Sequence, residues 1–262
     1  MSLALLNLGC GRRRHPAWTN TDLHPETPEV ITVDVRAPLP FDAAEFDAAY
    51  ASHVLEHLAP DAGERLVREM FRVLKPRGVI RVVVPDLEGI CRSYLGELER
   101  AACGEPEAIE RHVWMTVELI DQMTRTRPGG LMLRWWFQEH VPAEAFVIER
   151  LGRESESTIA EFRQRVADGS RTPIPPGRWT DVPEPSDDQL LAFRRTGEAH
   201  RWMYDRVSLG RLLGVAGFVD IAVRSAQESL VPGWTEYGLD ADESGRAHKP
   251  DSLYLEAVRP AE

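Results

Sequence analysis

Residues 3–11 read LALLNLGCG, an apolar segment that runs directly into a turn with a glycine on each side of Cys10. Such near-continuous apolar residues are typical of a strand buried on both faces of a parallel sheet. Gly9 and Gly11 allow backbone torsions and a close ligand approach that a Cβ would obstruct. Because open α/β sheets bind ligands at the carboxyl ends of their strands, the turn predicts a site for a nucleotide-like cofactor. Taken alone, two glycines are equally compatible with an ordinary turn between a strand and a loop.

The composition is that of a soluble globular protein, since 43% of the 262 residues are hydrophobic and 28% are charged. This length allows one large domain, or one domain with a sizeable insertion. The net charge of −11 argues against nucleic acid as a partner, because nonspecific binding needs a basic surface. No segment approaches the roughly 20 apolar residues of a membrane span, and no secretory signal is present. The three cysteines lack metal-ligand spacing and predict reduced thiols in a cytoplasmic protein.

The first 86 residues alternate between strand and helix patterns. After the first apolar segment, strands are expected at residues 18–23, 30–33, 46–51 and 79–84. Asp61 and Glu64 resemble a capping box that opens a helix between the last two of these strands. A strand, a helix and a strand in this order imply a right-handed crossover and a parallel sheet.

The middle of the chain, residues 87–201, loses this alternation. Helices are expected at 86–102, 107–123 and 143–166, and the proline-rich stretch 172–188 is expected to be an exposed loop. An insertion of this length is most simply a lid or a substrate-covering region, because inserted segments carry specificity on a fixed scaffold. Helices that only pack, without contacting a ligand, are the alternative.

The strand and helix pattern returns near residue 202. Ser208 is the expected N-cap of a helix that ends at Gly217, and strands are expected at 218–223 and 252–258. We therefore predict one α/β domain formed by residues 1–86 and 202–262, with residues 87–201 inserted into it.

Four segments resemble class I S-adenosylmethionine-dependent methyltransferases, in that family's order and at its spacing. They are residues 6–11 (LNLGCG), 34–41, 46–58 (which end in HVLEHL) and 72–78 (RVLKPRG). The resemblance implies a Rossmann-like, mostly parallel sheet of the class I methyltransferase type, with a largely helical insertion after the fifth strand. It also implies S-adenosylmethionine as the cofactor. Residues 200–218 are similar to bacterial, methyltransferase type 11-like members whose substrates are uncertain.

The resemblance also implies the residues that bind the cofactor. The backbone at Gly9 and Gly11 would lie close to the methionine tail. Asp22 is placed to accept the ribose hydroxyls, and Asp34 resembles the family's adenine-contacting acid. Roles as turn or cap residues are the alternatives for both acids. The full predicted set is Leu8, Gly9, Cys10, Gly11, Asp22, Leu23, Asp34, Val35 (through its backbone N–H), Ser52, His53 and His57.

The spacing from Gly11 to Asp22 departs from dinucleotide-binding folds. Asp22 follows Gly11 by eleven positions, whereas roughly 20 are expected in those folds. The first crossover helix must therefore be very short or absent. Arg14 also stands where the third glycine of GxGxxG would fall, which disfavours NAD as the cofactor.

Catalysis by methyl transfer from a sulfonium needs mainly the positioning of the two reactants. If the acceptor is a hydroxyl, a general base within hydrogen-bond reach helps, and histidine suits this role near neutral pH. His53 and His200 are the leading candidates, with a structural histidine as the alternative for each. His53 and His57 are also spaced as metal ligands on a helix are, but the order HExxH and a third ligand are missing, so no metal is predicted.

The predicted function is transfer of a methyl group from S-adenosylmethionine to a small-molecule acceptor. A hydroxyl of a sugar or of a natural product is the acceptor that the resemblance favours. Two alternatives stay open: a cofactor-binding relative that does not methylate and acts as a scaffold, and an α/β enzyme that uses another nucleotide. The sequence does not determine the oligomeric state.

Overall fold

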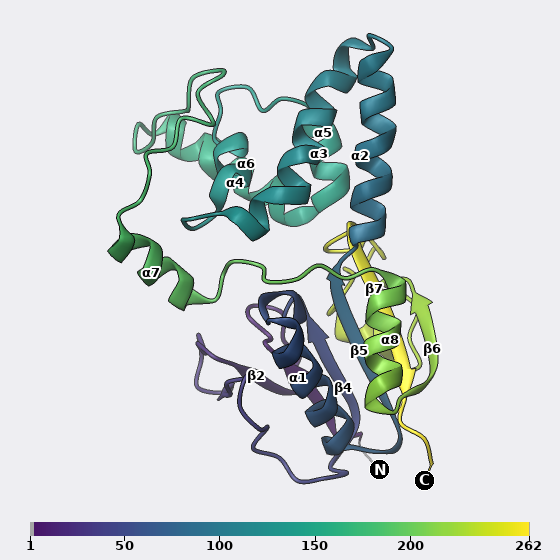
Figure 1. The fold of residues 1–262 in the computed structure, drawn as a ribbon. Helices are drawn as coiled ribbons and strands as arrows, with labels where there is room; N and C mark the ends of the chain where they lie inside the picture. The colour runs from purple at the N-terminus through teal and green to yellow at the C-terminus, as the bar shows by residue number, and fades with distance from the viewer. Residues whose placement is uncertain (1–2, 262) are drawn as a thin grey trace. The chain divides into compact units, whose positions relative to one another are not determined.

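The computed structural model describes residues 3–261, which divide into two compact units (Figure 1). The first unit contains the described residues up to Asp86, then Arg201–Ala247, and the described residues from Ser252 onward. The second unit contains Leu87–His200 and His248–Asp251. Each unit has its own packing and is described by itself below.

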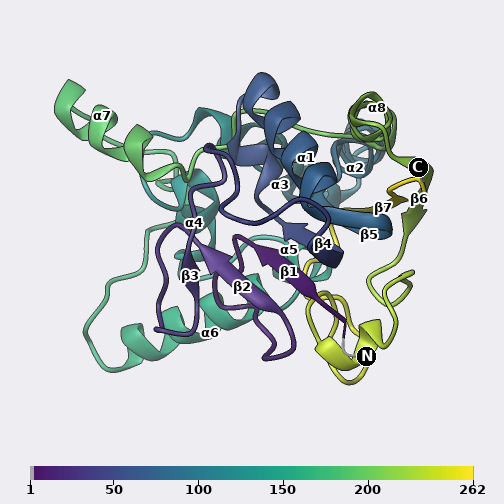
Figure 2. The ribbon, with the colours of Figure 1, turned by 90° about the horizontal axis from the view of Figure 1, so that it is seen from below.

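The first unit is built on a sheet that has seven strands in the described residues, in the order β3-β2-β1-β4-β5-β7-β6 (Figure 2). The strands are β1 (Leu5–Leu8), β2 (Thr19–Asp22), β3 (Ile31–Thr32), β4 (Phe46–Ser52), β5 (Leu74–Pro85), β6 (Val219–Arg224) and β7 (Ser252–Val258). Neighbours pair in parallel from β3 through β5, whereas β7 is antiparallel to both β5 and β6. This confirms the predicted α/β fold with a Rossmann-like, mostly parallel sheet.

One face of the sheet is covered by the helices α1 (Pro60–Val73) and α8 (Arg206–Ala216) (Figure 2). Because side chains alternate between the two faces of a strand, Leu6 and Leu8 of β1 both point to this side. Both are completely buried in the core that the two helices form with the sheet. The carboxyl end of β1, and with it the glycine turn, is therefore held firmly in place.

The opposite face is covered by residues 225–247, an irregular segment that contains the short 3-10 helix η2 (Trp234–Tyr237) (Figure 2). Leu5 and Tyr50 point to this face and pack with Trp18 and Trp234 in a second core. Tyr50 and Trp234 meet edge to face, with ring centroids 5.4 Å apart. A loop thus takes the place that crossover helices occupy in doubly wound sheets.

A buried ionic network ties this covering segment to the sheet. The side chain of Arg81 is fully buried and donates to Asp240 over 2.8 Å and to Glu256 over 2.9 Å. Its guanidinium lies 4.5 Å from the ring centroid of Trp234, and Tyr50 donates its hydroxyl hydrogen to Asp240. Buried charges persist only with such partners, so this network fixes the segment in one position.

The connection from β1 to β2 contains no helix in the described residues 9–18. It consists of turns, and the N–H of Cys10 donates to the carbonyl oxygen of Thr21 over 2.9 Å. The prediction that the first crossover helix is very short or absent is therefore confirmed.

The second unit is helical, which confirms the largely helical insertion after the fifth strand. Its helices in the described residues are α2 (Leu87–Ala102), α3 (Pro106–Thr124), α4 (Gly130–Trp136), α5 (Glu144–Leu151), α6 (Arg153–Ala167) and α7 (Asp187–Thr196). The single helix expected at 143–166 is wrong, because Gly152 interrupts it with φ +69° and ψ −143°. The helices of residues 3–261 include none with both the length and the apolar character that a membrane span requires.

Two predicted helix caps are also wrong. Helix α1 begins after Ala59 with Pro60 in its first turn, where the missing N–H costs nothing, and no side chain caps it. Asp61 instead pairs with Arg65 on the exposed helix surface over 2.7 Å. Helix α8 is capped by Asp205, and Ser208 is the third helical residue that completes the box.

Candidate functional site

The turn after β1 holds Gly9 and Gly11 in left-handed conformations, with φ of +64° and +48°. A Cβ on Gly9 would lie 2.5 Å from Cγ2 of Val54, so packing alone requires a glycine there. A Cβ on Gly11 would meet no atom within 4 Å. The backbone of Gly11 therefore faces open space at the carboxyl end of β1, where a ligand can approach it closely.

Asp22, at the end of β2, holds this turn in place. One of its carboxylate oxygens accepts the N–H of Gly11 over 2.9 Å, and the other accepts the N–H of His24 over 2.9 Å. Asp22 therefore acts as a turn residue, which was the alternative role expected for it. Each oxygen keeps a further lone pair, so hydrogen bonds to ribose hydroxyls are compatible with this arrangement. Leu23, the next residue of the predicted set, is exposed.

Cys10, between the two glycines, is buried. Burial and the nearby Asp22 carboxylate raise the pKa of its thiol. A protonated, buried thiol is a poor nucleophile, so Cys10 contributes backbone and packing to the turn. Leu8, the preceding predicted residue, is completely buried.

Asp34 follows β3 and forms a two-point contact with Arg36, with both distances 2.8 Å. It also accepts the backbone N–H of Arg36 over 2.9 Å. The hydrogen bonds from the Arg36 side chain lower the pKa of Asp34, which is therefore ionised at neutral pH. An adenine amino group would have to share these oxygens with Arg36, whereas the neighbouring Val35 would contribute only its backbone N–H.

His53 directly follows β4 and adopts φ +54°, a conformation that is uncommon for a residue with a Cβ. Its N–H donates to the carbonyl oxygen of Val83 over 2.8 Å. Backbone strain of this kind clusters at functional sites. Ser52, the last residue of β4, is half-buried beside it.

Both ring nitrogens of His53 have partners within hydrogen-bond reach. Nδ1 lies 3.1 Å from Oε1 of Glu56, whose side chain is completely buried. Nε2 lies 3.0 Å from Oγ of Ser252, the first residue of β7. The sequence analysis missed both partners: Glu56 carries a weak local signal, three residues after His53, and Ser252 carries none, being 199 residues away.

The other predicted histidines have different surroundings. His57 is half-buried at the end of the 3-10 helix η1 (Leu55–His57), where its N–H donates to the carbonyl oxygen of Val54. The expected helical spacing of His53 and His57 is therefore not realised on an α-helix. His200 belongs to the second unit, where it is buried and donates its N–H to the carbonyl oxygen of Gln122 over 2.9 Å. Its role as a base stays a prediction.

The buried side chain of Tyr204 packs against Gly63. A Cβ on Gly63 would lie 2.9 Å from the hydroxyl oxygen of Tyr204. Burial, together with the charge of Glu56, raises the pKa of Tyr204 to about 12. The phenol is therefore neutral at physiological pH and adds no charge near Glu56.

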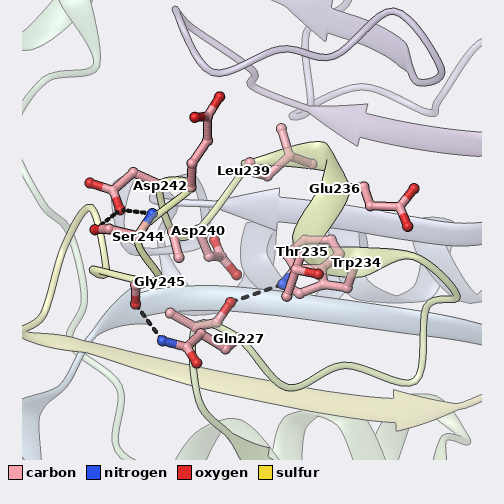
Figure 3. Close-up of a pocket in the computed structure, with 13 residues that line it drawn as sticks. Gln227, Trp234, Thr235, Glu236, Leu239, Asp240, Asp242, Ser244 and Gly245 are labelled. Carbon is pink, nitrogen blue, oxygen red and sulfur yellow. Dashed lines mark hydrogen bonds between the residues drawn. The ribbon is translucent and has the colours of Figure 1, made fainter.

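A separate cavity of about 460 Å³ lies within the segment that covers the other face of the sheet (Figure 3). All of its lining residues belong to 226–245, and they include Trp234, Glu236 and Asp240. The residues predicted to bind the cofactor do not line it. Gln227 and Gly245 are joined by a hydrogen bond across its edge, which shows that the cavity is shaped by the segment's own contacts.

Comparison with known proteins agrees with this geometry. Residues 6–82 match the model of the methyltransferase domain family, a stretch that includes the glycine turn, β2–β4 and most of β5. The matched stretch covers less than a third of the chain, and the mostly parallel sheet to which it contributes agrees with a methyltransferase domain. The protein is thus a methyltransferase, and S-adenosylmethionine is its cofactor. No curated protein sequence matches the chain.

Several solved structures are similar at low sequence identity. A possible histamine N-methyltransferase from Thermotoga maritima is 13% identical with a TM-score of 0.43, over 99% of this chain and 83% of that one. A methyltransferase from Archaeoglobus fulgidus is 11% identical with a TM-score of 0.42, over 98% and 86%. One from Mesorhizobium loti is 19% identical with a TM-score of 0.38, over 98% and 91%. Because these TM-scores are below 0.5, the assignment rests on the family match and the sheet.

Proposed function

We propose that this methyltransferase transfers the methyl group to a hydroxyl oxygen of a small molecule, such as a sugar or a natural product, by in-line displacement. The observation that supports a hydroxyl acceptor is the imidazole of His53, held between Glu56 and Ser252 at the end of β4. An alcohol loses its proton when it is methylated, and a positioned histidine is suited to receive that proton near neutral pH.

The residues around the glycine turn fit the cofactor. Gly11 offers its backbone to open space, and Asp22 lies against it with lone pairs available for ribose hydroxyls. Asp34 contributes a second carboxylate after β3. We infer that these three residues, together with Gly9, hold S-adenosylmethionine at the carboxyl ends of β1 to β3.

The bound cofactor supplies a methyl carbon on a sulfonium sulfur, which leaves as a neutral thioether with the bonding electron pair. The residues of this chain orient the acceptor and receive its proton. Positioning contributes most to such a displacement, because two reactants held in line need no further encounter. His200 remains a second candidate base, and residues 87–201 remain a candidate lid over the acceptor.

The first test is a thermal-shift panel of S-adenosylmethionine, S-adenosylhomocysteine, NAD and NADP. Ligands that bind the folded state raise the melting temperature, so the two sulfur nucleotides should raise it and the two dinucleotides should not. Stabilisation by NAD alone would overturn the proposal.

The second test uses methyl-labelled S-adenosylmethionine with matched acceptors that carry either hydroxyl or amino groups. We expect label on oxygen, and a loss of about 10²–10⁴-fold in kcat for His53→Asn. Label on nitrogen would contradict the hydroxyl acceptor. Cofactor binding without turnover on any acceptor would instead support a scaffold role.

A further inference from the structure

We propose that Ser252 relays the acceptor's proton to His53, and that Glu56 is the residue that positions the imidazole. This inference deepens the proposed function and rests on it. Residues from two distant parts of the chain meet at one edge of the sheet. His53 follows the carboxyl end of the parallel strand β4, and Ser252 begins the antiparallel strand β7, where it pairs with Pro85 at the carboxyl end of β5.

The partners of His53 determine which nitrogen carries the proton. Nδ1 lies 3.1 Å from Oε1 of Glu56, and we assign the hydrogen to Nδ1 because a carboxylate at that distance can accept it. Nε2 then has a lone pair that accepts the hydroxyl hydrogen of Ser252 over 3.0 Å. This is the tautomer in which Nδ1 faces a possible acceptor and Nε2 can accept from the serine hydroxyl. In this arrangement the histidine is ready to take a proton from Ser252.

An acceptor molecule cannot reach Nε2 directly while Ser252 lies against it. Ser252 is half-buried, and its oxygen keeps lone pairs that can receive a proton. As the acceptor oxygen uses its electron pair to form the new bond to carbon, its proton passes to Oγ of Ser252. The original hydroxyl proton of Ser252 passes to Nε2 of His53 in the same step. Ser252 therefore ends as it began, and the net product is an imidazolium.

The surroundings favour that imidazolium. The side chain of Glu56 is completely buried and that of His53 is 15% exposed, so little water screens the attraction between the two charges. The phenol of Tyr204, beside Glu56, stays neutral and does not compete for the charge. Glu56 thus acts through His53, and after the methyl transfer the imidazolium releases its proton to solvent.

The first experiment needs no acceptor. In the full chain labelled with ¹⁵N-histidine, the resonances of His53 report which nitrogen is protonated and whether the other accepts a hydrogen bond. We expect a protonated Nδ1 and a hydrogen-bonded Nε2 in the wild type. Ser252→Ala should shift Nε2 to the position of a nitrogen without a hydrogen bond, whereas Ser252→Thr, which keeps the hydroxyl, should not. A proton on Nε2 in the wild type, or no shift in Ser252→Ala, would overturn the proposal.

The second experiment measures turnover on the hydroxyl acceptor that is found with labelled cofactor. We expect Ser252→Ala to lower kcat by about tenfold or more with little change in KM, and Ser252→Thr to restore most of it. A proton inventory in mixtures of H₂O and D₂O should be curved for the wild type, where two protons move, and linear for Ser252→Ala. If the kcat of Ser252→Ala equals that of the wild type while His53→Asn is inactive, the relay through Ser252 is wrong, but His53 is still supported as the base. If His53→Asn is also fully active, the proposed base itself fails.

Discussion

Gly9 and Val54 pack so closely that a Cβ on Gly9 would lie 2.5 Å from Cγ2 of Val54. The contact joins the turn after β1 to the residue that follows His53. Any side chain at Gly9 would therefore displace the segment that holds the candidate base, and a loss of cofactor binding in such a variant would not identify the turn as the binding site. Gly11 is the position where a side chain tests ligand contact alone, because its surroundings are open.

We predict that Gly11→Asn raises the dissociation constant of S-adenosylhomocysteine by about tenfold or more, equivalent to ~1.4 kcal/mol or more of binding free energy. Asparagine tolerates the left-handed backbone at this position, so the melting temperature without ligand should change little. Isothermal titration calorimetry measures the affinity. The matched control is Gly177→Asn, since Gly177 has φ +74° and equally open surroundings in the second unit. An unchanged affinity of Gly11→Asn for S-adenosylhomocysteine would show that this turn does not bind the cofactor.

The buried network around Arg81 leads to a prediction about stability. Arg81→Leu leaves Asp240 and Glu256 without their shared cation in a site that water does not reach, and removing one partner of a buried ion pair costs about 3–5 kcal/mol. Urea unfolding followed by circular dichroism should show a much lower midpoint for this variant.

The control for this prediction is Arg65→Ala, which removes an exposed ion pair with Asp61. Exposed pairs contribute about 0–1 kcal/mol, so this variant should unfold close to the wild type. Equal losses in the two variants would show that the loss in Arg81→Leu does not come from burial of its charge.

The parts of the fold that the sequence predicts are those with a local physical signal. The first strand and its glycine turn are visible because burial on both faces demands continuous apolar residues and the turn demands positive φ. The absence of the first crossover helix follows from the short spacing between Gly11 and Asp22. The candidate cofactor residues are consequently predictable from their positions at strand ends.

The features of the fold and of the candidate site that the sequence does not predict depend on contacts between distant residues. Ser252 meets His53 across 199 positions and Asp240 meets Arg81 across 159, and neither contact leaves a periodic pattern in the chain. The break at Gly152 in the expected helix also depends on a contact with a distant residue. A Cβ there would lie 2.7 Å from the carbonyl oxygen of His248, a residue nearly a hundred positions away.

The correction at α8 leads to a third prediction. Asp205 accepts the N–H groups of Val207 and Ser208, both over 2.8 Å, so Asp205→Ala should destabilise the protein by about 1 kcal/mol. These hydrogen bonds, led by the one from Ser208, lower the pKa of Asp205. The contribution should therefore be present at neutral pH and be lost as the pH falls through the folded-state pKa.

Asp205→Asn, which keeps a cap acceptor, should recover most of that stability. Asp61→Ala is the contrasting variant because Asp61 caps no helix. A loss in Asp61→Ala as large as that in Asp205→Ala would contradict the assignment of the cap.

A fourth prediction concerns the pH dependence of stability through Asp251 in the second unit. Desolvation, followed by the nearby charge of Glu118, raises the pKa of Asp251 to about 7, while Lys249 and Arg150 act in the opposite direction. The folded state therefore keeps a proton that the unfolded state has released above pH 3.8. The contribution of Asp251 to the free energy of unfolding is complete at low pH, and it decreases as the pH rises towards 7.

Asp251→Asn removes this dependence because the amide stays neutral. Relative to the wild type, the variant should gain stability between pH 4 and pH 7 and level off above, with a gain of about 1 kcal/mol or more at pH 8. Urea unfolding at pH 4.5, 6 and 8 measures the difference. Asp168→Asn is a control with the opposite pH dependence of stability. Hydrogen bonds from Ser170 lower the pKa of the exposed Asp168 carboxyl, so its contribution to stability is present at high pH and lost on acidification. A stability difference between Asp251→Asn and the wild type that is constant across this range would show that the carboxyl of Asp251 is ionised in the folded protein throughout.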